Sequence, residues 1–171
     1  DKPDANNFQD EDIWIRNKLA ALIEDTKNNF KNYRFDYAAR NLYSFIWQDY
    51  CSWYIEIKKS KLNEKNINSL EKNLIIHNLR EILKNILLLL HPIMPFITEE
   101  IYSDLFNEKK FLQDNRYPDS NKFSSSSDAE NINWMIEIVS AIRKTRSEIG
   151  VQPNKKIEII VTGENDKDKL F

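Results

Sequence analysis

Trp14, Arg16, Asn17 and Lys18 combine an aromatic ring, an amide and two cations within about one helical turn. A ring of this kind can stack on an unpaired nucleic-acid base, while amides and cations bind base edges and phosphates. We therefore expect Trp14 to stack on a base or shape its pocket, and the three polar residues to contact base edges or phosphate. The alternative is that Trp14 packs against a preceding helix and that the cations are solvated, because large aromatic side chains are more often packing groups.

A second set of cations lies near the carboxy end, where Arg143, Lys144 and Arg146 are followed by Lys155 and Lys156. These side chains could follow a phosphate backbone or pack against another domain of the same protein. The alternative is an ordinary charged helix face, paired with nearby glutamates. Arg40, close to the expected start of the second helix, could reach nucleic acid or solvent.

No set of residues in the sequence converges on catalysis. Glu99 and Glu100 are adjacent, so on a helix they diverge by about 100° and cannot act as a facing carboxylate pair. We expect them to cap a helix instead. Cys51, His77 and His91 do not have the spacing of zinc ligands. With only two glycines in the chain, a glycine-rich phosphate loop is also excluded.

The amino-acid composition is that of an ordinary globular protein. Apolar residues make up 41% and charged residues 30% of the 171 positions, and the net charge is −2. Any nucleic-acid contact must therefore be local. The single cysteine is consistent with a reducing compartment, and the most apolar stretch is interrupted by polar and charged residues. We expect a cytoplasmic monomer without a membrane span.

Helical periodicity dominates the first half of the chain. A first helix should begin at the acidic run Asp10–Asp12 and end near Lys31, and a second should run from Asp36 to about Lys59. The second helix carries an aromatic stripe at offsets of four, three and four residues, formed by Tyr43, Trp47, Tyr50 and Tyr54. We expect this stripe to pack in the core; exposed rings would instead form a stacking platform.

A proline hinge and a capping pattern divide the second half. Pro92 should end a third helix that starts near Leu70, and Pro95 should start a fourth that runs to Phe106. The residues expected to face inward on the fourth helix are Ile97, Ile101, Leu105 and Phe106. Ser127 and Glu130 match a capping box, and Gly150 should end the fifth helix. Residues 156–162 alternate like a strand. We expect a helical bundle in residues 1–127, and in 128–171 a helix and strand that begin a truncated α/β element.

Three stretches together carry a resemblance to a known family. They are Tyr33–Trp47, which continues to Tyr50–Glu56; the hinge His91–Tyr102; and Ile142–Ile157. They closely resemble the carboxy-terminal anticodon-binding region of bacterial-type valyl-tRNA synthetases, which are class I aminoacyl-tRNA synthetases. The segment Asp12–Leu19 is similar to the helix that opens this region. The sequence departs from the family pattern at Ser52 and Tyr102, where Asp and Trp are common.

The resemblance implies a mainly α anticodon-binding bundle of a class Ia synthetase. Its partners would be the anticodon stem-loop of valine tRNA and the parent catalytic domain. The residues expected above to bind nucleic acid would then be the tRNA-binding residues. They are Trp14, Arg16, Asn17 and Lys18, then Arg40, and Arg143, Lys144 and Arg146. ATP and Mg would be bound by the parent catalytic domain, so this fragment should hold no cofactor, metal or catalytic residue.

Two alternatives remain beside this interpretation. One is the same domain of an isoleucyl enzyme, which carries a similar hinge. The other is a helical protein-interaction module without RNA affinity. RNA binding needs a contiguous basic and aromatic surface, whereas a protein partner needs an exposed apolar one, so the surface of the fold discriminates between them.

Overall fold

A computed structural model describes residues 8–106, 110–125, 130–152 and 155–158 of the chain. The chain divides into two compact units, Asp1–Asp128 and Ala129–Phe171. The boundary lies one residue beyond the expected division at Ser127. The described residues are helical, with turns and short irregular connections, and contain no strand. Among them, no helix has the length and apolar character needed to cross a membrane.

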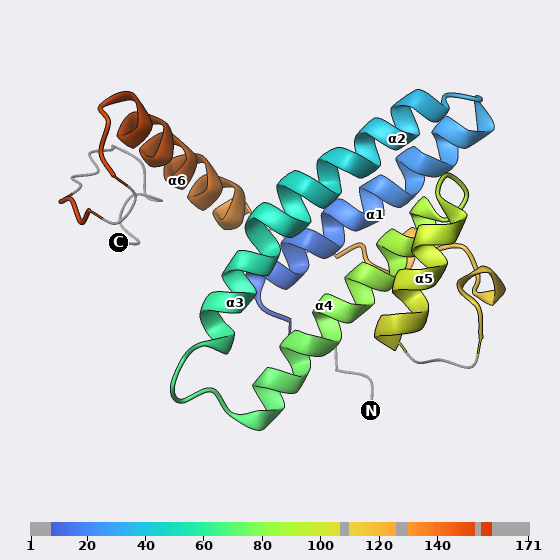
Figure 1. Ribbon diagram of the computed structural model, residues 1–171, viewed down its shortest axis with the longest axis horizontal. Helices are drawn as coiled ribbons and strands as arrows, with labels where there is room; N and C mark the ends of the chain where they lie inside the picture. The colour runs from blue at the N-terminus through green and yellow to red at the C-terminus, as the bar shows by residue number, and fades with distance from the viewer. Residues whose placement is uncertain (1–7, 107–109, 126–129, 153–154, 159–171) are drawn as a thin grey trace. The chain divides into compact units, whose positions relative to one another are not determined.

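The first unit is a bundle of helices joined by short turns (Figure 1). Its elements are α1 (Asp10–Lys31), α2 (Phe35–Ser44), the π-helix η2 (Phe45–Ile55), α3 (Glu56–Leu62), α4 (Ser69–Leu90), α5 (Pro95–Phe106) and the 3-10 turns η3 (Leu112–Asp114) and η4 (Ser120–Lys122). The helical character and the expected bounds of the first, third and fourth helices are confirmed. Local signals account for them: Asn68 Oδ1, for example, accepts a hydrogen bond from Glu71 N at 2.8 Å and caps α4.

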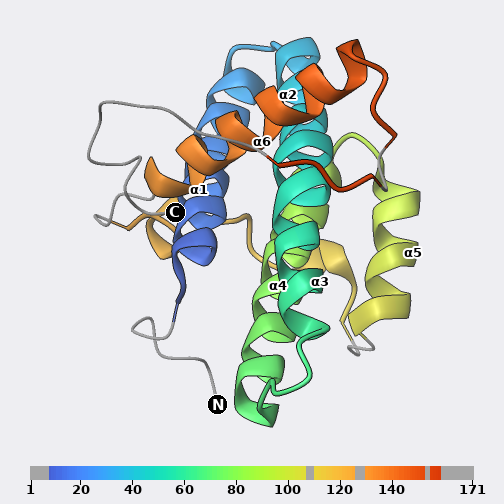
Figure 2. The same cartoon turned by 90° about the vertical axis from the view of Figure 1, so that its left-hand side faces the viewer.

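Helices α1, α2 and α4 surround the core of this unit (Figures 1 and 2). Buried apolar side chains recur along α1 at helical spacing, and α2 and α4 bury matching side chains. The fully buried members of this core include Ile15, Leu19, Ile23, Leu42, Ile82 and Ile86. The α1–α2 hairpin and α4 are therefore packed around one shared core.

The expected second helix is a continuous helical rod made of three segments. Its central part, η2, has the wider hydrogen-bond pattern of a π-helix, in which each residue bonds to the fifth residue along the chain. Each residue of η2 therefore turns through less than the 100° or so of an α-helix. The face that points inward consequently changes along the rod.

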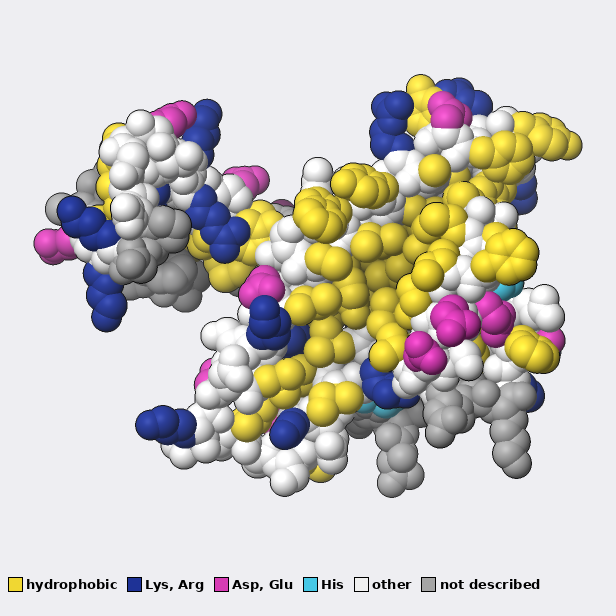
Figure 3. Space-filling view, viewed as in Figure 1, with side chains coloured by type: hydrophobic (Ala, Val, Ile, Leu, Met, Phe, Trp, Pro, Cys, Tyr) yellow, Lys and Arg dark blue, Asp and Glu magenta, His cyan; other side chains and the backbone are white. Residues whose placement is uncertain are grey.

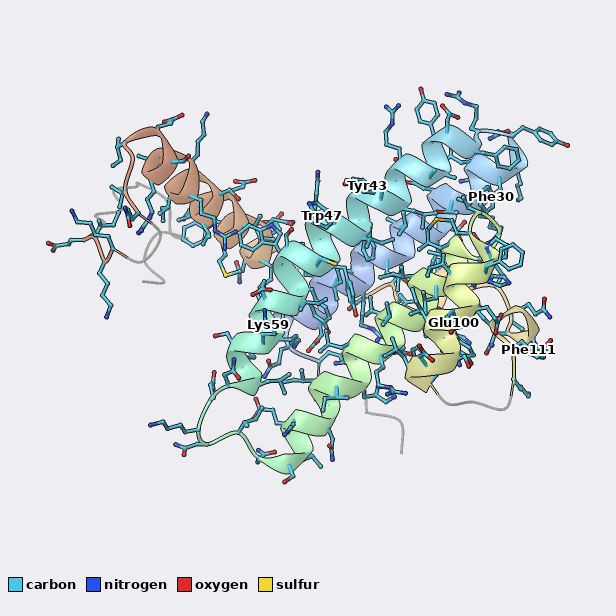
Figure 4. The ribbon with its side chains drawn as sticks, in the orientation of Figure 1. Phe30, Tyr43, Trp47, Lys59, Glu100 and Phe111 are labelled. Carbon is cyan, nitrogen blue, oxygen red and sulfur yellow. The ribbon has the colours of Figure 1, made fainter. Side chains whose placement is uncertain are left out.

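This change of face splits the expected aromatic stripe. Tyr50 and Tyr54 are buried as expected, but Tyr43 and Trp47 are 68% and 61% exposed. Figure 4 shows these two exposed rings on the α2–η2 ribbon. The core-packing interpretation is therefore right for two members of the stripe and wrong for the other two, because η2 rotates the later members toward the core.

A buried charge network joins the start of α1 to the end of the rod. Lys58 Nζ lies 2.9 Å from Glu11 Oε1 and 2.8 Å from Asp12 Oδ1, and Tyr54 Oη donates to Asp12 Oδ1 at 2.6 Å. Lys61 adds a second cation at 2.6 Å from Glu11. Because each buried charge has an opposite partner, the network fixes how α1 and α3 meet without leaving a charge unpaired.

The hinge after α4 behaves as its prolines predict. α4 ends at Leu90 and α5 begins at Pro95. His91 Nδ1 lies 2.8 Å from Thr98 Oγ1, which ties the two sides of the hinge together. Glu99 is a cap, but for another element: its carboxylate accepts a hydrogen bond from Leu112 N, the first residue of η3, at 2.8 Å.

The inward face of α5 differs from the expected one. Thr98 and Tyr102 are buried, whereas Ile97 and Leu105 are 52% and 46% exposed. Tyr102 packs with Leu87 and Leu112, and Thr98 is anchored at the hinge. Ile101 and Phe106 pack against this cluster, so the expected inward face is right for these two residues and wrong for Ile97 and Leu105. The hydrophobic surface between α2 and α5 is visible in Figure 3.

The second unit contains helix α6 (Glu130–Glu148) followed by a turn. Gly150 follows the helix with a φ of 69°, as expected for a glycine stop. Most of the capping pattern at 127–130 and most of the expected strand at 156–162 lie outside the described residues. Within the strand, residues 156–158 are described and have no strand structure.

Candidate nucleic-acid interface

Trp14 is a core residue in this structure. Its side chain is only 3% exposed, and Lys18 Nζ lies 5.2 Å from the centre of its ring. A buried ring leaves no face open for a base. The stacking role expected for Trp14 therefore has to be corrected in favour of the packing alternative.

The side chain of Arg16 is buried and already bound to other groups of the protein. Its guanidinium group donates to Glu81 Oε2 at 2.6 Å and to the carbonyl oxygen of Lys122 at 3.3 Å. It also lies between the rings of Phe8 and Phe123, at 4.4 Å and 4.9 Å from their centres. Because a carboxylate already neutralises it and two rings cover it, Arg16 joins α1 to α4 and η4 and is not presented to a ligand.

Asn17 and Lys18 are also engaged within the bundle. Asn17 Oδ1 accepts a hydrogen bond from Ser125 N at 2.7 Å. Lys18 Nζ lies 2.8 Å from Asp49 Oδ1, although its side chain stays 41% exposed. Trp14, Arg16, Asn17 and Lys18 therefore mainly hold neighbouring segments against α1. Trp14 and Arg16 are buried, whereas Asn17 and Lys18 are partly exposed.

The cationic side chains of α6 differ in exposure and in hydrogen bonding. Arg146 donates to the carbonyl oxygens of Gln152 and Lys155, at 2.8 Å and 2.9 Å, and thereby braces the turn after the helix. Lys144 is 79% exposed and lies 4.0 Å from Glu148 Oε1, an exposed pairing that contributes little. Arg143 is exposed as well. Arg143 and Lys144 are thus the members of this set that face solvent.

Arg40 lies in a surface cluster that was not predicted from the sequence. The turn between α1 and α2 exposes three aromatic side chains next to two arginines; we call Tyr33, Arg34, Phe35, Tyr37 and Arg40 the turn cluster. The three rings are 82%, 55% and 43% exposed, in chain order. Figure 3 shows hydrophobic and cationic side chains together at this end of the bundle. The available signal was the alternation of rings and Arg in residues 33–37, directly beside a helix boundary.

The turn cluster is internally ordered by ring contacts. Arg34 lies 3.9 Å from the centre of the Tyr37 ring, and Arg40 lies 5.7 Å from the same ring. Phe35 contacts Tyr33 edge-on at 6.3 Å and also contacts Phe30, labelled in Figure 4, at 5.8 Å. Arg34 also lies 3.6 Å from Asp36 Oδ1, but both side chains are more than half exposed, so this pair is weak. The turn cluster therefore places exposed aromatic rings and arginine side chains together at one site.

A family model described as the anticodon-binding domain of tRNA ligase matches residues 12–161, which is most of the chain. The chain belongs to this family of tRNA-ligase domains. Its curated relatives include proteins named valine–tRNA ligase from Francisella tularensis, Coxiella burnetii and Lactobacillus johnsonii. In the same order they are 36%, 37% and 34% identical, over 94%, 99% and 98% of this chain.

The matched region is a small part of each relative. The chain covers 18% of the Francisella protein and 19% of each of the other two. It therefore spans about a fifth of the length of the curated relatives it matches. The shared name favours the valine enzyme over the isoleucine enzyme as the origin of the resemblance.

Proposed function

We propose that this chain is the anticodon-binding part of a valine–tRNA ligase and that it binds the anticodon region of valine tRNA. The observation that carries the proposal is the family match across residues 12–161, together with relatives that share one name. The remaining part of the protein would activate valine with ATP and Mg and transfer it to the tRNA. This part would contribute binding energy and position rather than chemistry.

The surface of the first unit supports RNA as the ligand. Unpaired bases of an RNA loop are recognised by stacking on aromatic rings or guanidinium planes, and phosphates by Arg and Lys. The turn cluster combines both kinds of group at the end of a rigid hairpin. We therefore assign the RNA contacts to the turn cluster, with Arg143 and Lys144 of the second unit as further phosphate contacts.

We propose the catalytic part of the same protein as the second partner. Ile93, Met94, Phe96 and Ile97 at the hinge are exposed, and Phe96 is 90% exposed. Apolar side chains gathered in this way are typical of a protein contact. A helical module that binds only proteins would expose such a surface and have no affinity for RNA, so RNA binding is the property to test.

The test is a titration of this chain with a valine-tRNA transcript and with a transcript whose anticodon is changed, each at two salt concentrations. We expect tighter binding to the valine anticodon, and this preference should remain at the higher salt. Equal and strongly salt-dependent binding of both transcripts would indicate phosphate contacts alone. Absence of binding to either would contradict the proposal that this chain reads the anticodon by itself.

A further inference from the structure

The turn between α1 and α2 holds a tyrosine where the backbone favours a glycine. Tyr33 has a φ of 56° and is the first residue after the cap of α1. Arg34 N donates to Asn29 O at 2.8 Å, and Tyr33 N donates to Phe30 O at 3.1 Å. These two bonds define a Schellman motif, whose left-handed residue is usually glycine because a Cβ atom is strained there.

The end of α6 provides an internal comparison. Val151 N donates to Arg146 O at 2.9 Å, and Gly150 N donates to Ser147 O at 3.2 Å, which is the same motif. Here the left-handed position is occupied by Gly150, with a φ of 69°. The same backbone arrangement thus occurs twice in the described residues, once with the unstrained residue and once with a strained aromatic one.

Burial does not offset the strain at Tyr33. The side chain is 82% exposed, and the ring it touches, Phe35, is itself 55% exposed. A tyrosine in this position therefore adds little to the core while it raises the energy of the folded backbone. Strain that the fold does not need is a reason to look for a role in binding.

We propose that Tyr33 is held in this conformation to present its ring as a stacking platform for an unpaired RNA base. The proposal rests on the proposed function, which supplies the RNA. Tyr33 lies in the turn between α1 and α2, and its side chain is 82% exposed. Arg34 and Arg40 flank Tyr37 nearby and would neutralise the phosphates on either side of the stacked base.

The test uses a substitution that should stabilise the fold and weaken binding at once. Tyr33→Gly relieves the strain, so we expect Tm to rise by about 2–4 °C, the response to a modest stabilisation in a chain of this size. The same variant loses the ring, and we expect its Kd for the valine-tRNA transcript to rise about tenfold. Tyr33→Phe keeps ring and strain and should match the unsubstituted chain in both measurements.

Phe111→Ala provides the matched control, because Phe111 is also exposed (61%) and lies elsewhere on the first unit (Figure 4). It should leave the Kd unchanged. If the unsubstituted chain binds the transcript and Tyr33→Gly binds it equally well, the stacking role is overturned while the proposed function stands. If Tyr33→Gly lowers Tm, the strain argument fails. If the unsubstituted chain does not bind the transcript at all, the proposed function falls, and the stacking role with it.

Discussion

At the scale of single residues, the charge of Lys58 depends most strongly on compensation by its neighbours. It is a completely buried cation between Glu11 and Asp12, and Tyr54 donates to the second of these carboxylates. Burial raises the pKa of Tyr54, and the charge of Asp12 raises it further, so Tyr54 stays a neutral donor. The four side chains are stable only as a set, because each charge relies on another to offset its loss of water.

We expect Lys58→Met to destabilise the first unit by about 3–5 kcal/mol, because Asp12 would lose its buried cation while Lys61 would still pair with Glu11. Chemical denaturation of the chain measures this loss. The matched control is Lys59→Met, one residue further on, where the side chain is 58% exposed and pairs with Glu56 at the surface. That change should cost less than about 0.5 kcal/mol. Equal effects of the two substitutions would contradict the buried network.

The same network predicts a pH dependence. Burial by itself would raise the pKa of Glu11, but hydrogen bonds from Lys61 and Lys58 outweigh it, so the pKa lies below its ordinary value of 4.5. Because the folded state lowers this pKa, the stabilisation is complete above 4.5 and is lost as pH falls through the folded-state pKa. The difference in unfolding free energy between the unsubstituted chain and Lys58→Met should therefore narrow in acid. A difference that widens in acid would contradict the ionised state of Glu11 in this network.

At the scale of elements, η2 decides which aromatic side chains form the core. An uninterrupted α-helix would place Tyr43, Trp47, Tyr50 and Tyr54 on one face. With the π-helix after α2, Tyr50 and Tyr54 are buried, whereas Trp47 and Tyr43, at the end of α2, are exposed. Tyr50 is fixed further by a hydrogen bond from its hydroxyl to Leu79 O at 2.9 Å. Trp47 is thereby left on the surface.

Alanine substitutions of Tyr50 and Trp47 test which of these two rings contributes to the core. Tyr50→Ala should lower the free energy of unfolding by about 3 kcal/mol, because it leaves a cavity beside α4. Trp47→Ala should change it by less than about 0.5 kcal/mol. Denaturant titration of both variants is the measurement, and comparable losses for the two would contradict the exposed position of Trp47.

Some features of the fold are set by residues close together in the sequence, and others depend on residues that are far apart. Acidic residues and prolines mark helix ends within a few residues of sequence, so the bounds of α1, α4 and α5 could be predicted from the run Asp10–Asp12, Pro92 and Pro95. The facing of the aromatic stripe could not, because the hydrogen-bond pattern of η2 is not visible in periodicity. The environment of Arg16 depends on Glu81, which is 65 residues away in sequence, so its internal ion pair was equally hidden. The turn cluster was missed because exposure of its rings is a property of the fold.

At the scale of the whole molecule, charge is distributed unevenly despite a net charge of only −2. Arg16 and Lys58 serve the interior of the first unit, while Arg34, Arg40, Arg143 and Lys144 reach solvent. A domain of this kind would bind RNA through few phosphate contacts, and its affinity should depend only moderately on salt.

Removal of two exposed cations tests this distribution. We expect the double variant Arg143→Ser, Lys144→Ser to weaken binding of both tRNA transcripts by the same factor and to lower the slope of log affinity against log salt by about 2. Lys59→Ser, another exposed lysine, should leave the slope unchanged. A loss confined to the valine anticodon would mean that these residues read bases rather than phosphates.

The most direct test of the central claim is a chemical footprint of valine tRNA with and without this chain. Nucleotide-by-nucleotide reactivity would be measured along the whole tRNA at saturating protein. We predict protection concentrated in the anticodon loop, with the acceptor end as reactive as in free tRNA. Protection of the acceptor end instead, or uniform weak protection along the tRNA, would contradict the assignment of this chain as an anticodon-binding domain.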